Sequence, residues 1–244
     1  MAQLQNGIPR SGTVVRPRAE VDEGLRAYML RVYNYMAAGV GLTGVVAYFT
    51  SQIARTNPEV AQLLYGSPLK YVIMLAPLAF VLYLSFQVYK MSPGAAQIAF
   101  WAFAAVMGVS LSSIFLVFTG QSIAQVFFVT AAAFAGLSLY GYTTSKDLSG
   151  WGSFLIMGVI GIIVAALLNL FLQSGALAFA INVLGVLIFA GLTAYDTQQI
   201  KDGYYMIRDD SAALAKSAIM GALSLYLDFI NMFTSLLSLF GDRE

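Results

Sequence analysis

Seven long apolar segments, separated by short polar breaks, constrain the fold of this chain more than any other feature. A helix needs about 20 mostly apolar residues to cross about 30 Å of hydrocarbon, and each segment has close to that length. The segments are residues 33–52, 71–89, 95–118, 123–142, 152–172, 177–195 and 217–240. They lack the strict alternation of β-barrel strands. The sequence therefore predicts an all-α integral membrane protein with a bundle of seven transmembrane helices.

The composition supports this class and excludes several kinds of chemistry. Hydrophobic residues make up 59% of the chain and charged residues 10%, against about 25% charged residues in an average soluble domain. The net charge of +1 gives no indication of a nucleic-acid partner. Because the chain has no cysteine and no histidine, a Ser-His-Asp triad and a zinc site of the HExxH type are both excluded. The sequence predicts neither an enzyme nor a bound cofactor.

The distribution of basic residues predicts the orientation in the membrane. Counted on alternate sides of the seven segments, ten lie on the side of the N-terminus, and only Arg55, Lys70 and Arg243 lie on the other. The ten are Arg10, Arg16, Arg18, Arg26, Arg31, Lys90, Lys146, Lys201, Arg208 and Lys216. The positive-inside rule then makes the N-terminus cytoplasmic. Residues 1–27 are expected to form a flexible polar tail, which can touch anionic lipid headgroups, and residues 28–244 the transmembrane domain.

Two aspartates, Asp196 and Asp228, lie in apolar surroundings that favour a functional role. An ionised carboxylate near the middle of a bilayer costs about 2.5 to 3.5 kcal/mol on insertion scales. Asp228 belongs to a small and polar stripe with helical spacing, which must face the protein interior. The stripe consists of Gly221, Ser224, Asp228, Asn231, Ser235 and Ser238. Thr193 and Gln199 share a helical arc with Asp196.

The two aspartates meet only if at least one of their helices extends beyond its apolar segment. Their expected depths differ by about 10 Å, a gap that closes if the sixth helix continues past Lys201 or the seventh begins around residues 212–217. Within hydrogen-bond range the carboxyls would share a proton and act as a pH switch. The alternative is a permanently protonated pair that only holds two helices together. With Ser224 and Asn231, the carboxylates would also make a weak, transient calcium site.

Small residues indicate where helices approach closely, because association in lipid depends on close backbone packing. We expect such contacts at a small set in the first and fifth helices: Gly39, Gly41, Gly44, Gly161 and Ala165.

Three motifs carry a resemblance to a known family. They are GLTAYDTQQIK at residues 191–201, LSLYLDFINMF at residues 223–233 and SPGAAQIAFWAF at residues 92–103. Together they resemble the Bax inhibitor-1 (transmembrane Bax inhibitor motif) family, and the third resembles its bacterial branch. The resemblance implies a bundle with the last helix at its centre, a pH-sensitive calcium leak, and a location in the bacterial inner membrane. It also implies that Asp196 and Asp228 are the proton-sensing pair.

The chain departs from this family pattern in its second helix. Leak-competent relatives can carry a glutamate and an arginine there, and residues 71–89 contain neither. A counter-charge for the aspartates must then come from elsewhere, and Arg31, Lys90 and Lys201 are the candidates.

Two other functions are considered, and the first starts from the same aspartate pair. An intramembrane aspartyl protease would also use paired aspartates, but Leu225, Tyr226 and Leu227 stand where a Gly-x-Gly run would precede Asp228. A regulatory role is the main alternative, in which the protein binds and modulates another membrane protein, such as a membrane-bound quality-control protease, through its N-terminal tail.

Overall fold

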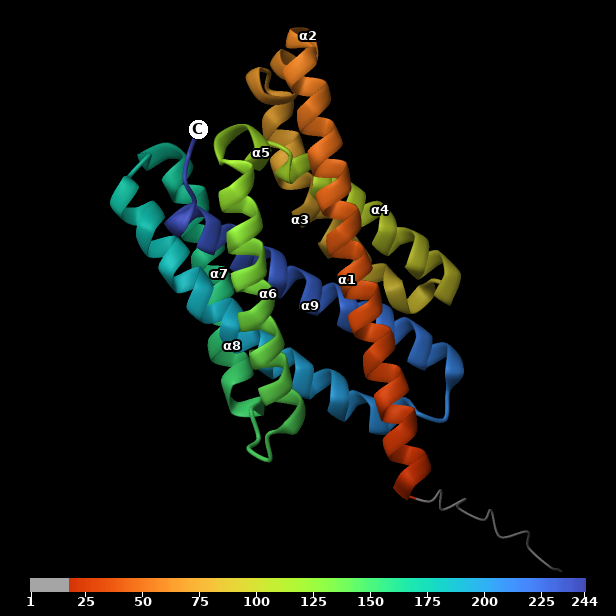
Figure 1. Ribbon diagram of the computed structural model, residues 1–244. Helices are drawn as coiled ribbons and strands as arrows, with labels where there is room; N and C mark the ends of the chain where they lie inside the picture. Colours follow the sequence, from red (N-terminus) through yellow and green to blue (C-terminus); the bar gives the residue numbers. More distant parts are fainter. Residues whose placement is uncertain (1–17) are drawn as a thin grey trace, which may run out of the picture.

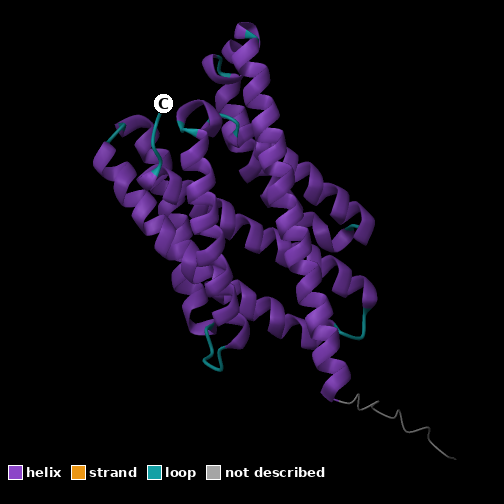
Figure 2. Ribbon diagram, in the orientation of Figure 1, coloured by secondary structure: helices purple, strands orange, loops and turns teal. Residues whose placement is uncertain are grey.

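The computed structural model describes residues 18–244, and in these residues the chain is a bundle of helices (Figures 1 and 2). Within residues 18–244, seven helices are long and apolar enough to cross a membrane, as predicted. The long helices are α1 (Arg18–Thr56), α3 (Leu69–Gln87), α4 (Pro93–Leu111), α6 (Gly120–Thr143), α7 (Ser149–Leu172), α8 (Gly175–Ile207) and α9 (Ser211–Phe240). Short helical turns, α2 (Pro58–Ala61), a π-helical turn (Gln62–Gly66), a 3₁₀ turn (Val88–Lys90) and α5 (Ile114–Val117), connect them.

Polar residues at the predicted breaks start the helices by capping free backbone N–H groups. The Ser92 hydroxyl accepts a hydrogen bond from the Ala95 N–H at the start of α4, next to Pro93 in the first turn. Thr119 caps α6 in the same way. The Asp210 carboxylate accepts from two backbone N–H groups at the start of α9. These caps determine where α4, α6 and α9 begin.

Three helices extend beyond their apolar segments on the side of the bundle where α1 begins. Helix α8 runs past Lys201 to Ile207, and α9 begins at Ser211, so both of the extensions considered above are present. The extensions pack on α1. The Tyr28 ring lies 5.4 Å from that of Tyr204, and the Tyr28 hydroxyl bonds to Ser217 at 2.9 Å. Residues 18–27 of the expected tail are therefore helical, and residues 1–17 lie outside the described residues.

Helix α9 lies at the centre of the bundle, packed against α1, α4, α6 and α8 (Figure 1). In its most apolar window 56% of the residues are buried, against 28% or less in each of the other six spans, which identifies it as the central helix. Its fully buried Tyr226 donates to the Thr43 hydroxyl of α1 at 2.6 Å, and Thr43 donates to the Ala104 carbonyl of α4 at 2.8 Å. This chain of hydrogen bonds joins three helices in the core. The predicted central position of the last helix is confirmed.

The close helix contacts coincide only partly with the predicted small residues. A Cβ on Gly39 would lie 2.7 Å from the Phe100 ring, so α1 packs closely there. Gly44 and Gly161, by contrast, face open space. Among the glycines of α6, only Gly141 makes a close contact, and its position leaves no room for a Cβ beside the backbone of Ala194 in α8. Such packing of backbone on backbone requires glycine.

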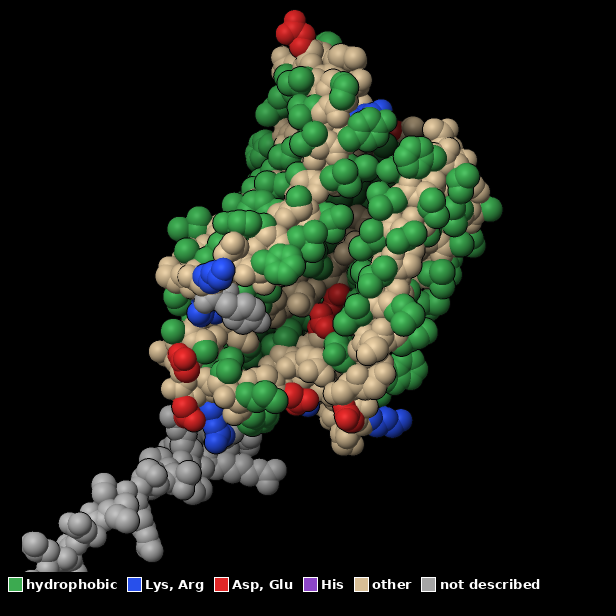
Figure 3. Space-filling view, turned by 180° about the vertical axis from the view of Figure 1, so that it is seen from behind, with side chains coloured by type: hydrophobic (Ala, Val, Ile, Leu, Met, Phe, Trp, Pro, Cys, Tyr) green, Lys and Arg blue, Asp and Glu red, His purple; other side chains and the backbone are tan. Residues whose placement is uncertain are grey.

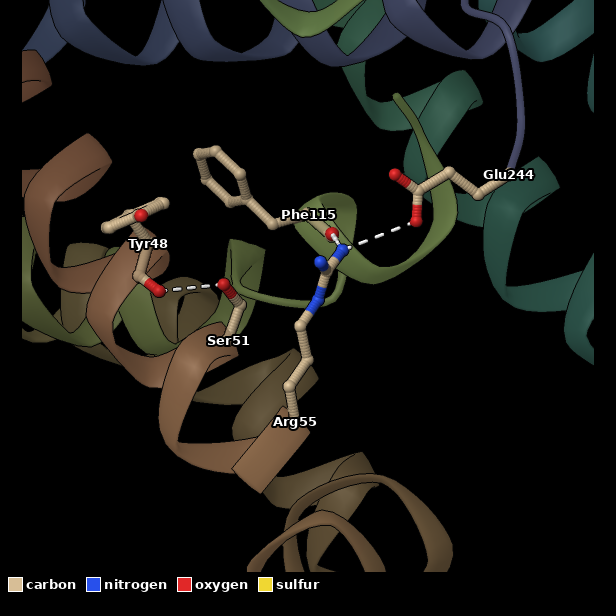
Figure 4. Close-up of polar contacts among 5 residues, drawn as sticks. All are labelled: Tyr48, Ser51, Arg55, Phe115 and Glu244. Carbon is tan, nitrogen blue, oxygen red and sulfur yellow. Dashed lines mark hydrogen bonds and ion pairs between the residues drawn. The ribbon is translucent and has the colours of Figure 1, made fainter. Parts of the chain in front are cut away.

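The chain after α9 is tied to the loop before α6, at the end of the bundle opposite the start of α1 (Figure 1). The Thr119 N–H donates to the Asp242 carbonyl, and the Glu244 N–H donates to the Val117 carbonyl, both at 3.0 Å. Arg55 of α1 donates to the Phe115 carbonyl and lies 3.3 Å from the Glu244 carboxylate (Figure 4). These contacts connect α1, α5 and the end of α9.

The Arg55–Glu244 ion pair is expected to contribute little to stability. Both side chains are about half exposed, at 44% and 50%, and exposed ion pairs contribute at most about 1 kcal/mol. Glu244→Gln should therefore shift the thermal unfolding midpoint only slightly, and less in high salt. A large drop in that midpoint would mean that the ion pair matters more than its exposure allows.

Candidate ion site between helices α8 and α9

Two close contacts fix the register of the antiparallel helices α8 and α9. A Cβ on Gly221 of α9 would lie 3.0 Å from the Ile200 side chain of α8. Farther along the pair, a Cβ on Gly185 of α8 would lie 2.6 Å from the Ser235 hydroxyl of α9. Gly221 and Ser235 both belong to the predicted polar stripe. The stripe therefore faces α8.

The same register places the two aspartates on facing sides of the helices. Asp228 lies level with Leu192 and Thr193, and Asp196 lies level with Ser224 and the residue after it. The carboxyl-bearing positions are therefore offset by about one helical turn, or about 5 Å along the helix axes. The structure brings the predicted pair together as neighbours, and no hydrogen bond joins the two carboxyls in the described part of the chain.

The carboxyl group of Asp228 is buried and has no partner. Its side chain is 3% exposed, and its Oδ2 atom has no contact with water and no hydrogen-bond donor. Within residues 18–244, neither Asp228 nor the half-buried Asp196 forms an ion pair or a side-chain hydrogen bond. A space-filling view shows acidic side chains in a hollow that hydrophobic side chains flank (Figure 3). A buried acceptor without a donor indicates a site for a proton or a cation.

The predicted supporting residues divide into two groups. Ser224 and Asn231 are half-buried on the same face of α9 as Asp228. The Asn231 amide donates to the Leu227 carbonyl at 2.8 Å, so its own carbonyl oxygen can still act as a ligand. The hydroxyl of Thr193 donates to the Phe189 carbonyl of its own helix. Gln199 donates to the hydroxyl of Ser149 at the start of α7, away from the aspartates.

None of the three candidate counter-charges pairs with the aspartates. Lys201 donates to the Tyr142 carbonyl at 3.0 Å, and its ammonium lies 5.9 Å from the centre of the Tyr142 ring. Arg31 and Lys90 are exposed. Lys201 therefore joins α8 to the end of α6, and the site has no cation from the described residues to balance its charge.

Hydroxyl groups next to Asp196 were not among the predicted site residues. The Tyr33 hydroxyl bonds to Ser138 at 2.6 Å, and Ser138 bonds to Thr197 at 2.9 Å. Thr197 in turn donates to the Thr193 carbonyl at 2.7 Å. This chain joins α1, α6 and α8 beside the aspartate. The signal in the sequence is that Ser138 lies within a long apolar run, where a hydroxyl needs a partner.

Gln198 holds the loop between α6 and α7 against α8. Its side-chain oxygen accepts from the Leu148 N–H at 2.8 Å, and its side-chain nitrogen donates to the Lys146 carbonyl at 2.8 Å. The side chain is only 5% exposed. Two partly buried hydrogen bonds thus fix the shape of this loop.

Gln198→Ala is expected to destabilise the protein by about 2 kcal/mol, because two partly buried backbone groups lose their partners. Gln199→Ala is the matched control, since Gln199 makes one exposed contact. Thermal unfolding of both variants in the same detergent measures the difference. Equal midpoints for the two variants would contradict the structural role of Gln198.

These observations define a class: a membrane protein of seven helices whose central last helix carries a buried carboxyl group, with a second carboxyl group on the preceding helix. Comparison with known proteins gives the family. The profile of the family described as "Inhibitor of apoptosis-promoting Bax1" matches residues 25–244. The chain belongs to the Bax inhibitor-1 family.

Relatives of this chain occur in several bacteria. An uncharacterized protein of Caulobacter vibrioides is 48% identical over the full length of both chains. The inner membrane protein YbhL of Escherichia coli K12 is 46% identical, over 97% of this chain and 99% of its own. An uncharacterized membrane protein of Streptococcus pyogenes is 37% identical, over 91% of this chain and 96% of its own. The similarity therefore covers nearly the whole length of each protein.

Proposed function

We propose that the protein lets cations, calcium in particular, leak across the membrane under the control of protons bound to Asp196 and Asp228. The observation that carries this proposal is the buried Oδ2 atom of Asp228, which has no donor and faces a helix with a second carboxyl group. A group of this kind is costly unless it binds a proton or a cation. The family membership agrees with this function without establishing it.

The ligands available at the site suit the passage of calcium ions better than their tight binding. Calcium prefers oxygen ligands, six to eight of them as a rule, and the site offers two carboxylates, the Asn231 carbonyl and the Ser224 hydroxyl. Among the described residues there is no cluster of three or more acidic side chains that would hold a metal ion tightly. Water molecules would have to complete the coordination shell. A cation bound in this way leaves easily.

Protons and cations compete for the same oxygen atoms in this proposal. With both carboxyls ionised, α8 and α9 carry two negative charges one turn apart, which attract a cation or push the helices apart. Protonation removes the charge and allows the helices to pack closely. The site is thus a two-state element whose charge and helix packing change together.

The orientation and the membrane are part of the proposal. The E. coli relative is named an inner membrane protein, and we infer the same location for this chain. The excess of basic residues on the side where α1 begins supports a cytoplasmic N-terminus.

Calcium flux into liposomes, measured from about pH 5.5 to about pH 8.5, tests the proposal. We expect a pH-dependent flux that changes by up to about tenfold per pH unit where the pair titrates. Asp196→Asn and Asp228→Asn should each flatten this dependence. Asp242→Asn, which removes an exposed carboxylate outside the helices, is the matched control and should behave like the wild type.

A flux equal to that of empty liposomes at every pH would reject the leak. The regulatory role then becomes the better proposal, with another membrane protein, such as a quality-control protease, as the partner. The lack of a glutamate or arginine in α3 favours this alternative. Its candidate contact region, residues 1–17, lies outside the described residues.

A further inference from the structure

A cavity of about 470 Å³ lies at the end of the bundle where α6 leads into α7. Helices α6, α7 and α8 and the loop after α6 form its wall. The loop contributes two neighbouring side chains of opposite charge, Lys146 and Asp147. Trp151 of α7, which is 60% exposed, and Tyr195 of α8 add aromatic rings, and the buried Leu155 adds an apolar wall. The cavity therefore combines both charges with an aromatic and apolar lining.

The loop backbone that carries the two charged residues has a fixed shape. Gln198 holds the loop backbone on both sides of Asp147, as described above. Asp147 accepts a hydrogen bond from the Ser149 N–H at 2.8 Å, and this bond holds the pKa of the Asp147 carboxyl below its usual value. Asp147 is therefore ionised at neutral pH. Within residues 18–244, neither Lys146 nor Asp147 forms an ion pair, so both charges can meet a ligand.

The arrangement fits a lipid headgroup that carries a phosphate and a primary ammonium group. The Lys146 ammonium attracts the phosphate, and the Asp147 carboxylate accepts hydrogen bonds from the ligand ammonium. The aromatic ring of Trp151 lines the same cavity, and aromatic rings attract cations. A purely anionic headgroup would be repelled by Asp147, and a choline headgroup has no N–H group to donate. The position of the cavity, where the apolar spans of α6 and α7 end, is the depth of a headgroup.

We propose that this cavity is a binding site for phosphatidylethanolamine, with its headgroup between Lys146 and Asp147 and an acyl chain along Leu137 and Leu155. The site is separate from the aspartate pair. Its wall also includes Ala194 and Tyr195, which directly precede Asp196 in α8. A lipid bound there contacts the segment of α8 that positions Asp196.

Fluorescence quenching by brominated lipids tests this site directly, because the chain has only two tryptophans. In a Trp101→Phe background, Trp151 is the single reporter. The protein is reconstituted in phosphatidylcholine vesicles that contain a small fraction of brominated phosphatidylethanolamine, phosphatidylglycerol or phosphatidylcholine. We expect phosphatidylethanolamine to quench Trp151 most strongly at equal fractions. Asp147→Asn should lower its relative affinity by about fivefold, the upper value for an exposed ion pair.

Asp202→Asn provides the matched control, since Asp202 is an exposed carboxylate on α8 outside the cavity. It should leave the lipid preference unchanged. Equal quenching by the three lipids, or a phosphatidylethanolamine preference that survives Asp147→Asn, would overturn the proposal. A preference for phosphatidylglycerol that Lys146→Gln removes would assign the cavity to an anionic lipid instead. Unchanged unfolding midpoints of the variants distinguish lost binding from lost folding.

Discussion

Gly141→Ala is expected to destabilise the protein strongly, by about 3 kcal/mol, the upper end of the usual cost of overpacking. The added methyl group would overlap the Ala194 carbonyl oxygen and would lie 2.9 Å from the Cα atom of Ala194. These are backbone atoms of a long helix, so they cannot rotate away as a side chain can. Helices α6 and α8 must separate, which also stretches the bond between Ser138 and Thr197.

Gly136→Ala in the same helix is the control, because Gly136 is exposed and a Cβ there meets no atom within 4 Å. Alanine is a better helix former than glycine by about 1 kcal/mol in water, so this variant should unfold at the same or a higher temperature. Thermal unfolding in detergent compares the two. Equal effects at both positions would show that the cost at Gly141 comes from helix propensity and not from contact with α8.

The membrane spans were predictable because hydrocarbon thickness sets the length of an apolar helix. The helix ends were less predictable. Helices α1, α8 and α9 continue into polar sequence, where hydropathy gives no signal, and contacts between distant residues such as Tyr28 and Tyr204 accompany these extensions. The short polar breaks after residues 89 and 118 were predicted well, since Ser92 and Thr119 act locally as caps. The long break predicted between the last two segments was wrong in extent, because α8 and α9 fill most of it and only the turn before the Asp210 cap remains.

The arrangement of the two aspartates followed from one periodic pattern, whereas the contacts of their neighbours with a third helix did not. The stripe on α9 has helical spacing, and its partner α8 is the neighbour in sequence, so the facing of Asp196 and Asp228 followed. Gln199 shares an arc with Asp196 but contacts α7, and Lys201 contacts the end of α6. Which of two adjacent helices a side chain contacts depends on the angles at which the helices pack. The spacing of residues along one helix does not determine these angles. The same reason explains why Gly44 faces open space while Gly141 makes a tight contact.

Asp228→Asn is expected to remove most of the pH dependence of folding stability. In the wild type, raising the pH removes protons from two carboxyls on facing helices, and the described residues supply no cation to balance the charge. The folded protein should therefore lose stability as the pH rises, by up to about 1.4 kcal/mol per pH unit for each proton released. Asparagine at position 228 stays neutral at every pH. The gap in unfolding midpoint between Asp228→Asn and the wild type should widen toward alkaline pH, while Asp242→Asn should follow the wild type.

Comparing Asp196→Asn with Asp228→Asn separates two contributions to the pH dependence of folding stability. One is the burial of each carboxyl group, and the other is the repulsion between the two carboxylates. Asp228 is almost fully buried, whereas Asp196 is half-buried and can keep part of its hydration when it is charged. If burial dominates, Asp196→Asn should leave a clear pH dependence and Asp228→Asn should leave almost none. If repulsion between the carboxylates dominates, each single variant should flatten the curve as much as the double variant does. Curves that stay parallel to the wild type in both single variants would mean that neither group releases its proton in this pH range. The pair would then only hold α8 and α9 together.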